Sequence, residues 1–193
     1  KTSLTVAGLV TGIAFWHYMY MRDVWVNTGA SPTVFRYVDW LITVPLQIVE
    51  FYLILAAVTK VSANLFWKLL IASLVMLVGG YAGEVGYADV GPAFFVGMAG
   101  WLYIIYEIFK GEASQINENS GNPASQQAFK TIRAIVTFGW AIYPIGYYLA
   151  YMSGGTHNSE ALNIIYNLAD LVNKAAFGLA IWVAATSDSE QTA

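Results

Sequence analysis

The sequence predicts an all-α protein that forms a polytopic bundle of transmembrane helices. Of its 193 residues, 58% are hydrophobic and only 11% are charged, whereas about 25% of the residues in a typical soluble domain are charged. Six apolar stretches approach the roughly 20 residues that a helix needs to cross a bilayer, and they lack the sustained alternation of barrel strands. No polar linker is long enough to divide the chain, so we expect one transmembrane domain over residues 1–193.

Turn-forming segments separate these stretches in order along the chain. The first two are divided by residues 27–32, and the third and fourth by residues 86–92. Residues 111–125, which are rich in Ser, Asn, Gly and Gln, predict a mobile surface loop before the fifth stretch. Residues 154–159 predict a turn before the last. The expected spans are about 2–21, 35–58, 65–85, 93–109, 128–152 and 161–184.

The basic residues predict how the bundle is oriented. In a six-span arrangement, one side carries most of them, and the other has only Arg22 and Arg36, with Lys174 in the middle of the last span. Because basic loops are retained in the cytoplasm, we expect the Lys60 and Lys110 loops to be cytoplasmic. The side richer in basic residues holds Lys1, Lys60, Lys68, Lys110, Lys130 and Arg133.

The lack of cysteine limits the chemistry that this chain can perform. It excludes disulfides, thiolate metal sites and cysteine nucleophiles. We expect no bound metal, no nucleic-acid partner and no enzymatic activity, and we expect the lipid bilayer as the main partner.

The second span carries a polar stripe. Arg36, Asp39, Thr43, Gln47 and Glu50 follow one another at spacings of three, four, four and three residues, which places them within about 80° around a helix. Charged groups in a span are costly and face the interior of a bundle. Two carboxyl groups about 16 Å apart along one face suit stepwise proton transfer. The alternative is that the stripe holds helices together by hydrogen bonds.

The last span contains a buried acid–base pair. Asp170 and Lys174 are four residues apart and therefore share a helix face. A lysine in an apolar run is a candidate for forming a Schiff base with a carbonyl compound. The alternative is a structural ion pair between the two side chains.

An aromatic face on the fifth span favours ligand binding near this lysine. Trp140, Tyr143, Pro144 and Tyr147 fall within about 100° of arc, and Pro144 is expected to leave a carbonyl unbonded and to bend the helix. An aromatic face alone is more often core packing. Together with the buried lysine, and with Trp40 as another wall, it predicts a slot for a flat apolar ligand.

Three motifs resemble those of the microbial rhodopsins, within them the proteorhodopsin group. They are RYVDWLITVPLQIVE at 36–50, WAIYP at 140–144 and YNLADLVNK at 166–174, and the likeness extends over essentially the whole chain. The family has seven spans and this chain aligns from the second onward, so the resemblance implies a seven-helix fold with six spans present and the first helix missing.

The resemblance also implies roles for the polar residues. Lys174 matches the lysine that binds all-trans retinal covalently as a protonated Schiff base. Asp39 matches the counterion and proton acceptor, and Asp170 the second counterion. Arg36 and His17 match partners of these counterions, and Glu50 matches the cytoplasmic proton donor. Positions that line the chromophore are matched by Trp40, Thr43, Gln47, Met76, Gly80, Trp140, Tyr143 and Pro144.

The function that the resemblance implies is light-driven proton transport out of the cell, across a bacterial inner membrane. Family chloride pumps lack the acid at the position of Asp39, and sensory members commonly lack a carboxylate at the position of Glu50. A glutamine at the position of Gln47 implies blue absorption, and the family likeness implies a ring-shaped homo-oligomer. The alternatives are a photosensory receptor with a slow photocycle and, ranked lower, a transporter or channel without retinal. We also expect Glu84 and Asp89 to be solvated loop charges, although both lie where they could assist proton release.

Overall fold

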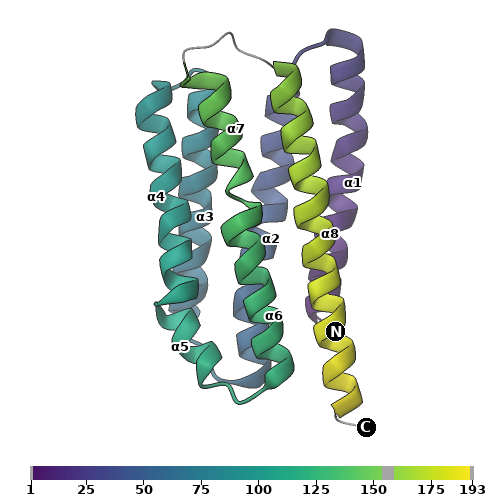
Figure 1. Cartoon of the computed structure of the whole chain (residues 1–193), viewed down its shortest axis with the longest axis vertical. Helices are drawn as coiled ribbons and strands as arrows, with labels where there is room; N and C mark the ends of the chain where they lie inside the picture. Colours follow the sequence, from purple (N-terminus) through teal and green to yellow (C-terminus); the bar gives the residue numbers. More distant parts are fainter. Residues whose placement is uncertain (1, 154–158, 192–193) are drawn as a thin grey trace.

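The computed structural model describes residues 2–153 and 159–191, and within these ranges the chain forms helices and no strands. The long helices lie side by side, and α1 begins at the same end of the bundle as α8 ends (Figure 1). The all-α prediction is therefore confirmed. The elements are α1 (Thr2–Thr28), α2 (Thr33–Val58), α3 (Ala63–Glu84), α4 (Val90–Phe109), α5 (Glu112–Glu118), α6 (Pro123–Ala134), the π-helical segment η1 (Ile135–Gly139), α7 (Ile142–Tyr151) and α8 (Ser159–Gln191).

Five helical stretches in the described ranges are long and apolar enough to cross a membrane. They are α1, α2, α3, residues Val90–Glu118 and residues Glu160–Ser187. The span expected at 128–152 is divided among α6, η1 and α7, which follow one another end to end along the bundle (Figure 1). Most of the turn expected at 154–159 lies outside the described residues.

Two boundaries differ from the sequence-based expectation. Helix α1 continues to Thr28 instead of ending near residue 21, because Arg22 and Asp23 are exposed and pair with each other at 3.3 Å, and water-facing charges do not break a helix. The expectation of a mobile loop at 111–125 is also wrong, because this segment contains α5 and the start of α6. The side chain of Asn122 caps α6 by accepting from the Ser125 amide at 2.8 Å.

The interior of the fifth span departs from α-helical hydrogen bonding just before Pro144. The Trp140 amide donates to the Ile135 carbonyl at 3.1 Å, the five-residue spacing of a π-helix. The Trp140 carbonyl, which Pro144 cannot satisfy, accepts from the Tyr143 amide at 3.1 Å, so the expectation of an unbonded carbonyl is wrong.

Side chains from two neighbouring helices bind the carbonyls of η1. The Trp101 indole of α4 donates to the Val136 carbonyl, and the Asn173 amide of α8 donates to the Gly139 carbonyl, each at 3.0 Å. Side-chain bonds from α4 and α8 therefore hold the π-helical segment on two sides.

Helices α3 and α4 approach each other at glycines. A Cβ atom added to Gly79 would lie 2.8 Å from the Gly97 backbone nitrogen, and one added to Gly100 would lie 2.7 Å from the Ala72 carbonyl oxygen. Small residues at such contacts let two helix backbones pack directly in a membrane. No larger residue fits there without moving a helix.

We expect Gly100→Ala to destabilise the bundle by about 1–3 kcal/mol, the usual cost of overpacking, because the new methyl group meets backbone atoms of α3. The matched control is Gly91→Ala, since a Cβ added at Gly91 meets no atom within 4 Å. Thermal unfolding in detergent, followed by circular dichroism, measures the difference. Equal midpoints for the two variants would refute the close packing.

Helix α2 occupies the middle of the bundle and packs against α1, α3 and α6. Its polar stripe faces inward, as predicted, whereas large apolar side chains such as Phe15 (70% exposed) and Leu171 (69% exposed) point outward. This distribution matches a protein whose surroundings are lipid. The buried stripe, in which no residue is more than 3% exposed, consists of Arg36, Asp39, Thr43, Gln47 and Glu50.

Candidate functional site

Lys174 lies between two buried aspartates. Its Nζ is 2.6 Å from Oδ2 of Asp39 on α2 and 3.0 Å from Oδ2 of Asp170, one turn earlier on α8. All three residues are at most 5% exposed. A buried cation is tolerated when opposite charges and hydrogen bonds compensate it, and here two carboxylates do so.

Asp39 is also held by neighbours on α1 and α2. Its Oδ1 is 3.1 Å from Nδ1 of His17. The Thr43 hydroxyl donates to the Asp39 carbonyl at 3.0 Å and lies 3.5 Å from its Oδ2. The side chain of His17 is 19% exposed, so this residue lies between the carboxylate and the edge of the bundle.

Asp170 accepts hydrogen bonds from three further side chains. The hydroxyls of Tyr18 and Tyr143 donate at 2.6 and 2.5 Å, and the Trp40 indole nitrogen lies 3.0 Å from Oδ2 and 3.1 Å from Oδ1. Such donors stabilise the charged form of a carboxylate. Asp170 is therefore more fully compensated than Asp39.

Arg36 lies further from Lys174 than the two aspartates do, beyond the residues that bond directly to the amine. Its guanidinium donates to Asn163 at 2.6 Å, to Asn167 at 2.9 Å and to the Tyr18 hydroxyl at 3.4 Å. Within the described part of the chain it forms no ion pair with either aspartate. Tyr18 connects it to Asp170, because the Tyr18 hydroxyl accepts from Arg36 and donates to Asp170.

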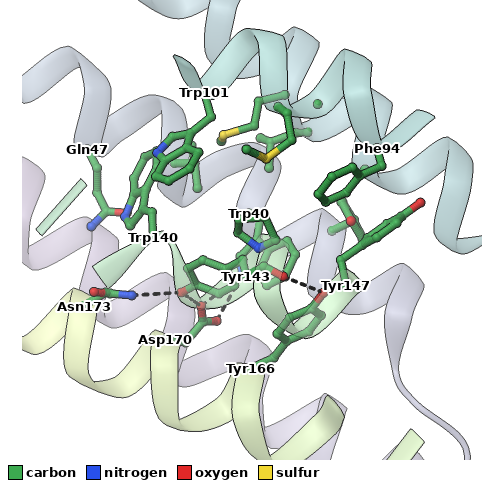
Figure 2. Close-up of a pocket in the computed structure, with 18 of the residues that line it drawn as sticks. Trp40, Gln47, Phe94, Trp101, Trp140, Tyr143, Tyr147, Tyr166, Asp170 and Asn173 are labelled. Carbon is green, nitrogen blue, oxygen red and sulfur yellow. Dashed lines mark hydrogen bonds between the residues drawn. The ribbon is translucent and has the colours of Figure 1, made fainter. Parts of the chain in front are cut away.

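A pocket extends from Lys174 along α3, α4 and α7. Figure 2 shows Phe94 and Tyr147 on one side of this space and Trp101 and Trp140 on another. Of the eight lining positions that the resemblance implied, Thr43 does not line the pocket and instead bonds to Asp39. The other seven line it: Trp40, Gln47, Met76, Gly80, Trp140, Tyr143 and Pro144.

Some lining residues were not identified from the sequence, although their spacing contained a signal. Phe94, Met98 and Trp101 line the pocket at positions i, i+4 and i+7 of α4, which is one helix face. Tyr166 and Asn173 line it from α8. Lys174 also lines it, so a ligand inside can reach the amine.

Glu50 stands apart from this cluster, in the half of α2 nearer the Lys60 loop. It is fully buried, and neither carboxyl oxygen has a hydrogen-bond partner within 3.5 Å among the described residues. Ser3 of α1 lies nearby. The structure thus places the two carboxyl groups of the stripe at different depths, as the spacing predicted.

The comparisons with known proteins agree with this geometry. A family model described as bacteriorhodopsin-like protein matches residues 1–188. The chain belongs to the bacteriorhodopsin-like family. It is 60% identical over 189 residues to a green-light absorbing proteorhodopsin of Gamma-proteobacterium EBAC31A08, covering 98% of this chain and 76% of the relative.

Two further relatives of this bacteriorhodopsin-like protein are named for blue light. A blue-light absorbing proteorhodopsin of Gamma-proteobacterium Hot 75m4 is 60% identical over 190 residues, covering 98% of this chain and 75% of the relative. The crystal structure of blue light-absorbing proteorhodopsin from Med12 is 66% identical with a TM-score of 0.84, covering 97% of this chain and 83% of that one. The resemblance to the proteorhodopsin group is confirmed. Together with the apolar helices, it makes this a multi-pass membrane protein.

Proposed function

We propose that this protein is a light-driven pump that moves protons out of the cell, using all-trans retinal bound to Lys174. The observation that carries the proposal is the placement of Lys174 Nζ between Asp39 and Asp170 at a pocket with several aromatic side chains in its walls. The residues fit the ligand, because a flat apolar chain suits the aromatic walls and an aldehyde condenses with a lysine amine. When bound, retinal supplies light absorption and a light-driven change of shape.

Asp39 is the proposed acceptor of the proton from the Lys174 nitrogen. Its Oδ2 lies at hydrogen-bond distance, and it has fewer donors than Asp170, whose three additional hydrogen bonds favour its charged form. The transfer neutralises both partners, and because Arg36 offsets Asp170 it strands no net buried charge. Arg36 is the proposed cationic partner of the counterions, acting on Asp170 through Tyr18.

Glu50 is the proposed donor that returns a proton to the Lys174 nitrogen. An isolated carboxylate buried without hydrogen bonds is costly, so the surroundings of Glu50 suit a group that keeps its proton until it is required. It lies on the same inward face as Asp39 but toward the opposite end of α2.

The proposed direction of transport is from the Lys60 and Lys110 loops toward the opposite end of the bundle. These loops lie at one end in Figure 1, and by the positive-inside bias this end faces the cytoplasm of a bacterial cell. Gln47 lines the pocket, which supports the proposal of blue absorption. We propose that residues 1–193 form one retinal-binding domain and that the protein assembles as a ring of identical chains.

Adding all-trans retinal to the protein is expected to produce a visible absorption band that Lys174→Ala lacks. Acidification should shift this band to longer wavelengths as the aspartate counterion takes up a proton. Illuminated cells should then acidify their medium, and a proton uncoupler should abolish the effect. Absence of a visible band would refute the retinal site. A band with a slow photocycle and no steady acidification would instead support the photosensory receptor.

A further inference from the structure

The wall of the pocket contains a hydroxyl group without a partner. Tyr147, one turn beyond Tyr143 on α7, is 4% exposed, and its hydroxyl has no hydrogen-bond partner within 3.5 Å among the residues that the structure describes. Its ring lies 5.5 Å from that of Phe94, measured between centroids, and both residues line the pocket. Because burial takes a hydroxyl out of contact with bulk water, leaving it unpaired is costly. The chain therefore leaves this donor to be satisfied by another molecule.

Other phenols close to Tyr147 have acceptors within the chain. The ring of Tyr151 lies 5.0 Å from that of Tyr147, and its hydroxyl donates to Glu84, the last residue of α3, at 3.3 Å. The expectation that Glu84 is a solvated loop charge is therefore wrong, whereas Asp89 is exposed as expected. Glu84 also accepts from the hydroxyls of Tyr37 at 2.9 Å and Tyr166 at 3.3 Å. The Tyr147 hydroxyl lies against the α3 backbone at Gly83, where any side chain would collide with it, so this position supplies no acceptor.

Tyr147 lies at the end of the pocket that is far from Lys174. Figure 2 shows Phe94 and Tyr147 at one side of the pocket and Asn173, which directly precedes Lys174 in the chain, at the opposite side. In the proposed complex, retinal is attached to Lys174 through its aldehyde carbon, and its ring is at the other end of a rigid conjugated chain. The ring is therefore the part of the ligand that we expect beside Tyr147.

We propose that the pocket is selective for retinals that carry an oxygen atom on the ring, and that the Tyr147 hydroxyl donates a hydrogen bond to this oxygen. The inference rests on the proposed retinal-binding function and specifies the class of ligand more closely. A carbonyl or hydroxyl oxygen on the ring accepts from a phenol. Plain all-trans retinal has no acceptor on its ring and leaves the phenol unpaired.

A hydrogen bond at this place favours an oxygenated ring for two reasons. Hydrocarbon offers the ring oxygen no donor, so its transfer from the membrane to the pocket pairs two polar groups that both lack a partner. A site that hydrogen-bonds its ligand also discriminates against an analogue without the acceptor, because its own buried group is then left unpaired. The competing account is that a water molecule bonds to the Tyr147 hydroxyl. It predicts equal binding of oxygenated and plain retinal.

The deciding experiment is a competition for the binding site. The protein is mixed with equal amounts of all-trans retinal and either 4-oxoretinal or 3-hydroxyretinal, and the bound aldehydes are extracted and separated by chromatography. We expect the oxygenated aldehyde to exceed plain retinal by about three- to tenfold, the factor that one net hydrogen bond contributes. The ring C=O stretch of bound 4-oxoretinal should also appear at a lower frequency than in a hydrocarbon solvent.

Variants of two phenols on α7 complete the test. Tyr147→Phe should bring the ratio of the two aldehydes to about one and return the ring C=O stretch to its frequency in hydrocarbon. Tyr148→Phe removes a phenol that is 49% exposed and should keep the ratio of the unchanged protein. If Tyr147→Phe fails to fold, the C=O frequency in the unchanged protein still decides. Equal uptake of all three aldehydes, or the same preference in Tyr147→Phe, would overturn the proposal. Absence of a visible band with every aldehyde would instead overturn the retinal site itself.

Discussion

Asp39→Asn is expected to abolish light-driven proton transport while retinal still binds. In the proposed mechanism Asp39 Oδ2, 2.6 Å from the Lys174 nitrogen, accepts its proton. An amide cannot do so, and loss of an acid–base group costs about 10²–10⁴-fold in rate. Removing the negative charge should also shift the visible band to longer wavelengths, because that charge stabilises the positive nitrogen in the ground state. The visible band of the variant should then no longer move on acidification. Light-induced pH change and absorption spectra measure these effects.

Thr43→Val is the matched control for Asp39→Asn. It removes the hydroxyl that bonds to the Asp39 carbonyl and approaches its carboxylate, but it keeps the acid. We expect it to retain transport and the pH-dependent shift of the band. If Asp39→Asn pumped protons at the rate of Thr43→Val, a different group would have to accept the proton.

Glu50→Gln is expected to slow the last half of the photocycle by about 10²–10⁴-fold without changing the visible band. Glu50 is buried in the half of α2 nearer the Lys60 loop, and without its proton the Lys174 nitrogen must be reprotonated from more distant water. Recovery in the variant should therefore become slower as the pH rises, since fewer protons are available. Flash photolysis at several pH values measures this dependence.

Glu107→Gln provides the comparison for the donor variant. Glu107 is also a buried carboxyl, at 3% exposure, but it lies on α4, where it accepts from the Tyr103 hydroxyl and lies 3.8 Å from the Lys68 amine. We expect its replacement to leave recovery unchanged. Equal recovery of Glu50→Gln and the unchanged protein would show that Glu50 is not the donor.

The polar stripe of α2 and the acid–base pair of α8 could be predicted from the sequence for a physical reason. Charged groups are so costly in hydrocarbon that, once the spans were assigned, residues such as Asp39 and Lys174 could only face inward. Helical spacing then placed them on common faces. The same reasoning gave the aromatic wall of the fifth span, because Trp140 and Tyr143 share one side of their helix, whereas Met76 and Gly80 were implied only by the resemblance.

Other features depend on contacts between distant parts of the chain and had no local signal. Tyr18 is one of 13 tyrosines, and nothing in its neighbourhood indicates that it bonds to Asp170, 152 residues away. Glu84 precedes a turn, where exposure is the usual outcome, and only the packing of α2, α7 and α8 brings three phenols to it. The π-helical segment likewise depends on Trp101 and Asn173, which lie on other helices.

The glycine contacts between α3 and α4 make one side of the pocket more rigid than the other. Where the backbones already touch at Gly79 and Gly100, a close-packed interior leaves no free space into which either helix could retreat. Met76, Gly80 and Gly97 belong to that unyielding side. The opposite side contains Trp140 and Tyr143, which follow η1 directly, and two carbonyls of η1 are each bound by one side chain. If the proposed ligand changes shape in the pocket, we therefore expect the fifth span to yield more readily than α3 and α4.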